Sequence, residues 1–102
     1  MFEVEGDVLE LRFNMQKIKT LETMQRVSLM AELSQSRGML SFALLEGLFT
    51  VALYNNTAEQ NVKGKKAQDI FNALLETEGY ANLNAVTVGK LQEDLGFLFL
   101  QN

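Results

Sequence analysis

The sequence predicts an α+β fold that is mainly α, with an N-terminal β-hairpin packed on a helical domain that has a buried central helix. Residues 2–13 alternate apolar and polar side chains around a turn signal, residues 38–54 form the longest apolar run, and much of the rest has apolar residues at helical spacing. The chain has 102 residues, 47% of them apolar, which suits one core. We therefore expect a single domain over residues 1–102, with residues 1–13 as the hairpin and residues 14–102 helical.

The hairpin is predicted by the pair Gly6-Asp7, a two-residue turn signal between two alternating runs. With this turn, Val4 pairs with Leu9. The next pair on the same face is Phe2 with Leu11. The apolar face of the hairpin then comprises Phe2, Val4, Leu9, Leu11 and Phe13. A lone hairpin is marginally stable in water, so this face should lie on helices, most simply on the central one.

After the hairpin, Asn14 is a good N-cap for a helix that begins at Met15. Apolar residues then recur every third position up to Leu33, a spacing that drifts by about 60° per step around a straight helix. Either the segment wraps around a core, or two shorter helices break near residues 26–28. We favour the break, because Ser28 can cap a second helix.

The apolar run at residues 38–54 predicts the central helix. Its apolar side chains sweep about 220° of the helix circumference, so other elements should surround it. The remaining strip suits water or the close approach of another backbone, and comprises Ala43, Glu46, Gly47, Thr50 and Tyr54. A membrane span is the alternative, but it needs about 20 apolar residues and would place Glu46 near its middle. The polar residues 34–38 introduce this helix, and Ser34 or Ser36 could cap it.

The C-terminal half reads as a polar connector followed by two helices. Residues 55–64 form the connector, the segment most suited to a mobile loop. The next helix spans about residues 65–78, with Gly79 as its stop. After a turn at residues 80–84, a last helix begins near Ala85. Its predicted core face comprises Val88, Leu91, Leu95, Leu98 and Phe99.

The composition excludes most catalytic chemistry. The chain has no Cys and no His, so it lacks thiolates and the commonest neutral-pH base and metal ligand. Strand alternation puts Glu3, Glu5 and Glu10 on a solvated face, which argues against a cation site or an acid/base pair there with Asp7. We expect no catalytic, cofactor-binding or metal-binding residues, and no enzyme activity. A net charge of −4 argues against nucleic acid as a partner. An acidic N-terminus without a cleavable apolar segment predicts the cytoplasm.

Two segments carry more apolar side chains than one core requires. Four of the five Met residues lie in residues 15–39, and a Met-rich surface can form an adaptable partner-binding groove, with core filling as the alternative. Phe97 and Leu100 leave the core face of the last helix, so the chain end is either clasped by the fold or exposed to another subunit. The candidate protein-binding residues are Phe97, Leu98, Phe99, Leu100, Met24 and Met30.

The order of parts carries a resemblance. A hairpin of the form Val4-Glu-Gly-Asp-Val-Leu-Glu-Leu-Arg-Phe13 leads through Asn14 into a helix carrying Ile18 and Leu21-Glu22. There follow an apolar helix around Leu44-Leu-Glu-Gly-Leu48, a polar connector, an amphipathic helix, and a closing helix carrying Val88 and Leu91. In this order the chain resembles the small tail assembly chaperones of tailed bacteriophages.

The resemblance implies a non-enzymatic function. Proteins of this family bind the tape-measure protein, keep it soluble and help the tail tube polymerise around it. The partner would be the tape-measure protein or another phage tail protein, and the chain would form a homo-oligomer in the bacterial host cytoplasm, without nucleic acid or membrane. The family often also has a longer form made by translational frameshifting. The alternative is a small homo-oligomeric helical module for regulation or protein interaction.

Overall fold

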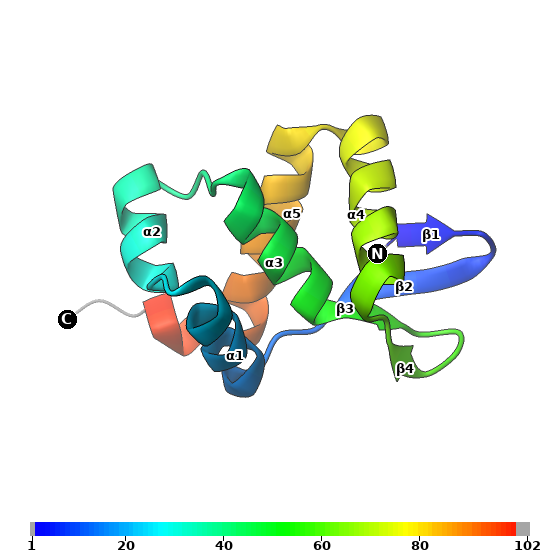
Figure 1. The fold of residues 1–102 in the computed structure, drawn as a ribbon, viewed down its shortest axis with the longest axis horizontal. Helices are drawn as coiled ribbons and strands as arrows, with labels where there is room; N and C mark the ends of the chain where they lie inside the picture. The colour runs from blue at the N-terminus through cyan, green and yellow to red at the C-terminus, as the bar shows by residue number, and fades with distance from the viewer. Residues whose placement is uncertain (1, 100–102) are drawn as a thin grey trace.

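The computed structural model describes residues 2–99, which fold into strands and helices in mixed order (Figure 1). Two strands come first and are followed by three helices: β1 (Phe2–Val4), β2 (Asp7–Leu11), α1 (Met15–Gln25), α2 (Leu29–Ser36) and α3 (Phe42–Ala52). Two strands, two helices and a 3-10 helix complete the chain: β3 (Leu53–Asn55), β4 (Gln60–Asn61), α4 (Gly64–Glu78), α5 (Tyr80–Asp94) and η1 (Gly96–Phe99). The fold is α+β and mainly α, as predicted.

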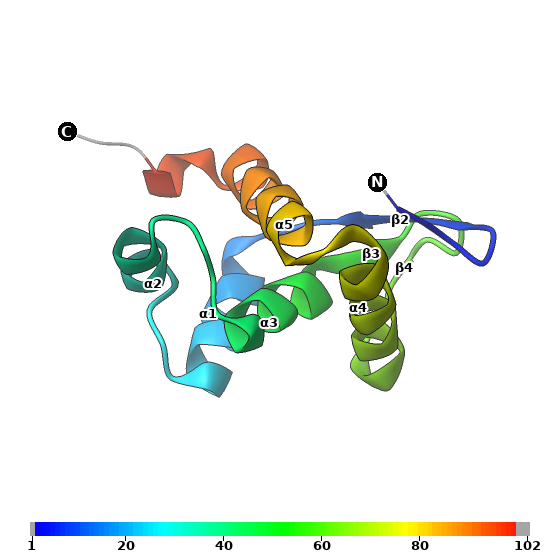
Figure 2. The same cartoon turned by 90° about the horizontal axis from the view of Figure 1, so that it is seen from above.

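Helix α3 lies at the centre of the molecule. It contacts α1, α4, α5 and β2, with α1 and α4 on either side of it in Figure 1 and α5 behind it, as Figure 2 shows from above. Its buried side chains are Leu44, Leu45, Leu48, Phe49 and Ala52. The ring of Phe49 packs between those of Phe2 (5.7 Å between centroids) and Phe71 (5.4 Å). The predicted buried central helix, with the hairpin packed on it, is therefore confirmed.

The ends of α3 differ from the prediction. The polar residues 34–38 do not introduce it, because α2 continues through Ser36 and ends in left-handed backbone at Arg37 (φ 57°). The cap of α3 is Ser41, whose hydroxyl accepts a hydrogen bond from the N–H of Leu44 (3.2 Å). Neither Ser34 nor Ser36 caps α3, and that expectation was wrong. Ser41 was not recognised as the N-cap because it is a single polar residue within a long apolar run.

The predicted break between α1 and α2 is confirmed. Asn14 caps α1 by accepting a hydrogen bond from the N–H three residues on (2.8 Å). Arg26 ends α1 in left-handed backbone (φ 54°), and the hydroxyl of Ser28 caps α2. The carboxylate of Glu22 accepts a further hydrogen bond from the N–H of Leu29 (2.6 Å), so α1 also holds the start of α2.

The N-terminal hairpin is half of a four-stranded antiparallel sheet with the order β1-β2-β3-β4. Leu11 of β2 lies opposite Leu53 of β3, and Leu9 lies opposite Asn55. The prediction placed Leu53 and Tyr54 in the central helix and expected no strand after residue 13, which was wrong. Their apolar character continues the run of α3, but their backbone pairs with the open edge of β2. This long-range pairing has no local sequence signal.

The hairpin register is shifted by two residues from the prediction. The loop is Glu5-Gly6 rather than Gly6-Asp7, and both loop residues have positive φ (50° and 84°), as a type I′ turn requires. Phe2 consequently pairs with Leu9. The Asp7 side chain accepts a hydrogen bond from the Asn55 amide (2.9 Å), which favours a strand position for Asp7. Because the shift is even, the predicted apolar face is preserved.

Both C-terminal helices begin earlier than predicted, and α5 ends at Asp94, before the predicted helix residues Leu98 and Phe99. Helix α4 begins one residue before the predicted start and ends at Glu78, before Gly79. Helix α5 begins directly at Tyr80, so residues 80–84 are helix and not a turn. The buried side chains of α5 are Leu83, Asn84, Thr87 and Leu91, and Leu95 is buried at its end. Of the predicted core face, Val88, Leu98 and Phe99 are only half-buried, because they lie toward α2 at the edge of the core.

Candidate protein-binding site

The structure separates the predicted protein-binding residues. Met30, Leu98 and Phe99 line one groove, between α2, α5 and η1. Met24 lies on α1 and lines a different groove. Phe97 lies outside both grooves and is 56% exposed. Leu100 falls outside the described residues, so its predicted role stays a prediction.

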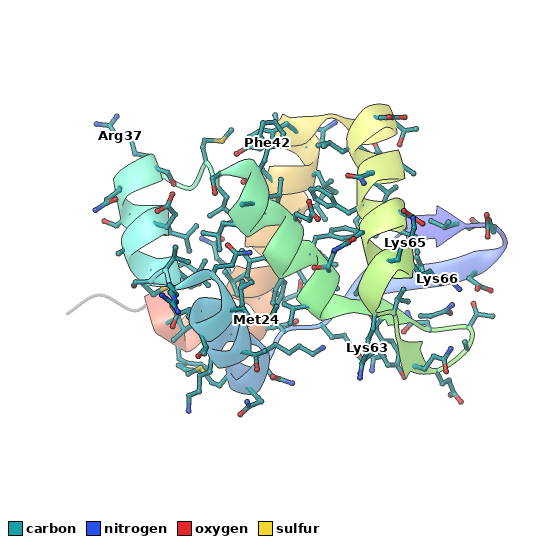
Figure 3. All side chains as sticks on the ribbon, viewed as in Figure 1. Met24, Arg37, Phe42, Lys63, Lys65 and Lys66 are labelled. Carbon is teal, nitrogen blue, oxygen red and sulfur yellow. The ribbon has the colours of Figure 1, made fainter. Side chains whose placement is uncertain are left out.

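We call the first of these the C-terminal groove. It has a volume of about 490 Å³ and is lined chiefly by Met30, Leu33, Arg37, Val88, Leu98 and Phe99. The lining also includes the polar side chains of Ser34 and Gln92, and Arg37 is its charged residue, at the C-terminal end of α2 (Figure 3). Such a groove can accept an apolar segment while the guanidinium remains at the rim.

The end of the chain forms one wall of this groove because it folds back after α5. The N–H of Leu95 closes α5, and the N–H of Leu98 donates to the Leu95 carbonyl (3.0 Å), which starts the tighter η1. The chain end was predicted to be either held against the fold or exposed. Leu98 and Phe99 are held against the core, whereas Phe97 is exposed.

A residue that sequence analysis missed holds another wall in place. Asn84 of α5 is only 4% exposed. Its Oδ1 accepts a hydrogen bond from the N–H of Leu40 (3.1 Å), and its Nδ2 donates to the carbonyl of Gly38 (2.7 Å). These bonds fasten the connection between α2 and α3 to α5. No sequence signal distinguishes Asn84 from the nearby Asn82, which is exposed.

We call the groove that Met24 lines the central groove. It lies between α1, α3 and the start of α4, with a volume of about 840 Å³. Its floor is most of the strip predicted for the central helix: Ala43, Glu46, Gly47 and Thr50. Its walls include Leu21 and Met24 from α1 and Val62 and Lys63 before α4. Met24 is 76% exposed, and Figure 3 shows it on the α1 side, with Lys63 at the start of α4.

Helix α1 crosses α3 at Gly47. A Cβ atom at this position would lie 2.6 Å from Cδ1 of Leu21 and would also meet the side-chain amide of Gln25. That amide donates a hydrogen bond to the carbonyl of Ala43 (3.0 Å). The strip of small residues therefore admits side chains of α1 rather than a second backbone.

Three basic side chains have perturbed pKa values. A hydrogen bond to Glu10 raises the pKa of Arg12, whose guanidinium also lies 3.7 Å from the centre of the Tyr54 ring. A hydrogen bond to Asp94 raises the pKa of Lys90. Burial lowers the pKa of Lys17 at the central groove, and the nearby charge of Arg12 lowers it further.

Other polar groups of residues 2–99 pair with near neighbours in the fold. Within residues 2–99, no three His, Cys, Asp or Glu side chains are grouped so that they could hold a metal ion. Among the acids of the hairpin, Glu10 pairs with Arg12 (2.6 Å) and Asp7 bonds to Asn55. No helix in this part of the chain has the length and apolar character needed to cross a membrane.

Comparison of the chain with protein-family models, with curated proteins and with solved structures finds no match. The chain is therefore assigned to no family. Its resemblance to the tail assembly chaperones rests on the order of its parts and stays a prediction.

Proposed function

We propose that this chain is a phage or prophage tail assembly chaperone that binds the tape-measure protein and assists tail tube assembly. It acts without catalysis, as a self-associating protein-binding module in the bacterial host cytoplasm. The order of hairpin, apolar helix and closing helices motivates this assignment. The observation that carries it is the C-terminal groove, in which Met30, Leu98 and Phe99 meet.

The groove suits an apolar helical partner. Met30 has an unbranched, flexible side chain that can adapt to different apolar surfaces. Leu98 and Phe99 are half-buried, so each keeps exposed area that a partner can cover. Val88 supplies a further apolar contact from α5. A helix laid into an apolar groove presents anchors on one face, as a long helical tape-measure segment would do.

The alternative is a small homo-oligomeric helical module for regulation or protein interaction. It is favoured by a different surface, at the N-terminal ends of α3 and α5. There Phe42 is 62% exposed and packs against Tyr80 with the two rings tilted by 60° (4.8 Å between ring centroids), and the neighbouring Met39 is also exposed. This surface is suited to contact with a second copy of the chain.

The proposed function is tested by co-expression with the tape-measure reading frame downstream, measuring how much of its product stays soluble. We compare Val88→Asp, in the C-terminal groove, with Val86→Asp, an exposed position on the same helix outside the groove. Wild type and Val86→Asp should keep the product soluble, and Val88→Asp should not. Circular dichroism establishes that both variants fold.

The outcomes separate the function from the site. A folded Val88→Asp variant that keeps the tape-measure product soluble would show that the C-terminal groove is not the contact. A wild-type chain that never binds the product would reject the tail-chaperone assignment itself. In that case the homo-oligomeric module becomes the better description.

A further inference from the structure

The central groove has the dimensions of a helix-binding site. Its floor runs from Ala43 to Thr50, a rise of about 10 Å or two helical turns. The floor residues are small or polar, and side chains of α1 already cover the floor at Gly47. Leu21, Met24 and Val51 supply apolar contacts along it. A partner helix would cover this length with residues at i, i+4 and i+7.

The two ends of the groove differ because α1 and α3 run in opposite directions. Gln25 of α1 contacts Ala43 near the start of α3, and Leu21 contacts Gly47 one turn further on. Met24 therefore lies toward the start of α3. Among the described residues, this end of the groove is lined by Met24, Gln25 and Ala43, none of which is charged.

The other end of the groove is basic. The Arg12 carbonyl accepts a hydrogen bond from Nζ of Lys17 (2.7 Å), and the Arg12 N–H donates to the last residue of α3 (2.8 Å). Lys17 consequently lies at the C-terminal end of α3. The N–H of Val62 donates to the first residue of β3 (3.0 Å), which brings the adjacent Lys63 to the same end.

None of the three charged side chains in the groove, Lys17, Glu46 and Lys63, has an ion-pair partner within residues 2–99. Glu46 is half-buried midway along the floor, and Lys63 is exposed at the basic end. A charge beside apolar side chains gains most from a partner that supplies the opposite charge at the same depth.

We propose that the central groove is a second protein-binding site, which takes an amphipathic helix with a basic residue in the middle of its apolar face and an acidic residue at one end. The basic residue pairs with Glu46, and the acidic residue pairs with Lys63 and Lys17. The apolar residues pack on Leu21 and Met24. This site is separate from the C-terminal groove and does not depend on the proposed function.

The probes are three fluorescein-labelled helical peptides of about 18 residues that share one Leu stripe. The first has Lys in the middle and Glu at one end, the second exchanges these charges, and the third has Gln at both positions. Fluorescence anisotropy gives the three dissociation constants with the full-length protein. The first peptide should bind about tenfold more tightly than the second, with the third between them. In heteronuclear NMR spectra, the first peptide should shift the amide signals of Gly47 and Gly64.

The matched variants exchange charges on the protein. Glu46→Lys/Lys63→Glu reverses two of the three unpaired charges of the groove and should reverse the preference, so that the second peptide binds better than the first. The control Lys19→Glu/Glu76→Lys changes the same residue types at exposed positions outside the groove and leaves the net charge unchanged. It should retain the wild-type preference.

Several results would overturn the proposal. These are no binding of the first peptide, equal binding of all three, amide shifts confined to Gly38 and the C-terminal groove, or an unreversed preference in the groove variant. Self-association that is lost in Glu46→Lys/Lys63→Glu and kept in the control would also overturn it, because a second copy would then occupy the groove. The peptide experiment contains no tape-measure protein, so failure of the tail-chaperone assignment leaves its result unaffected.

Discussion

Gly47 marks the closest approach between α1 and α3. Leu21, which meets it, is buried and cannot move aside without disturbing the core. Gln25 is held by its bond to the Ala43 carbonyl. The small side chain at position 47 is therefore required by packing, in the middle of a helix where glycine is otherwise unfavourable.

Gly47→Ala should destabilise the protein. Alanine gains about 1 kcal/mol in helix propensity, but overpacking against Leu21 and Gln25 should cost about 1 to 3 kcal/mol. The control is Gly89→Ala in α5, where nothing lies within 4 Å of the added Cβ. It should stabilise by about 0.5 to 1 kcal/mol. Urea unfolding measures both, and stabilisation of similar size in both variants would contradict the crossing at Gly47.

The buried amide of Asn84 has the clearest individual polar role. Asn84→Ala removes both hydrogen bonds and leaves the N–H of Leu40 and the carbonyl of Gly38 unsatisfied, at a cost of about 1 to 3 kcal/mol each. Asn82→Ala, two residues away and exposed, should change the unfolding free energy by less than about 0.5 kcal/mol. Thermal unfolding of the two variants tests this prediction. Equal losses of unfolding free energy would show that Asn84 contributes no more to stability than Asn82.

At the scale of elements, α3 gives the strongest test of the fold. Phe49→Ala should cost about 3 to 5 kcal/mol, and Leu48→Ala about 2 to 5, because both side chains are fully buried. Phe42→Ala, on the same helix but mostly exposed, should cost about 1 kcal/mol, chiefly from the lost tilted contact with the Tyr80 ring. Guanidinium unfolding measures all three variants. Losses under about 0.5 kcal/mol at both buried positions would place this helix on the surface.

Helices were predicted well where their signals are local. Asn14 and Ser28 cap their helices through bonds to residues three positions on, so a short stretch of sequence contains the whole motif. Helix α4 was predicted in the same way, from its apolar residues at helical spacing and from Gly79 at its end. Strand β3 was missed because its partner β2 lies far away in sequence. Strand β4 pairs with the nearby β3, but its two residues, Gln60 and Asn61, are both polar and give no strand pattern. Local pattern cannot distinguish the Leu53 segment from the end of an apolar helix.

The candidate site was only partly predictable. Met30, Leu98 and Phe99 were chosen as surplus apolar residues, and the fold brings them together from positions almost seventy residues apart. Met24 was chosen on the same ground but faces the central groove, because the break at residues 26–28 turns α2 away from α1. Surplus apolar character identifies residues that another part of the fold or a partner should bury. It does not identify which of these residues line the same groove.

At the scale of the whole molecule, exposed apolar side chains occur on several elements. They include Met24 on α1, Met39 before α3, Phe42 on α3 and Phe97 on η1. The core absorbs the other large apolar residues of α3, so these four add to the solvent-exposed apolar surface. Association of copies is the simplest way to cover such area.

We expect the protein to self-associate. Light scattering across a concentration series should give a mass above the 11.5 kDa of one chain, rising with concentration. Phe42→Asp and Phe97→Asp distinguish the two ends of the molecule, since a charge in the contact should restore the mass of a single chain. A strict monomer at high concentration would reject an exposed self-association patch and the homo-oligomer prediction with it.

The sequence by itself determined the fold class, the buried face of the central helix, the apolar face of the hairpin and the caps of α1 and α2. These depend on periodicity and on side-chain bonds that span a few residues. The tertiary structure alone decided the hairpin register, the pairing of β3 with β2, the early start of α5 and the grouping of candidate residues into two grooves. Each of these depends on a partner distant in the chain, such as Asn55 for Asp7 or Gly38 for Asn84. A local pattern contains no information about such a partner until the chain is folded.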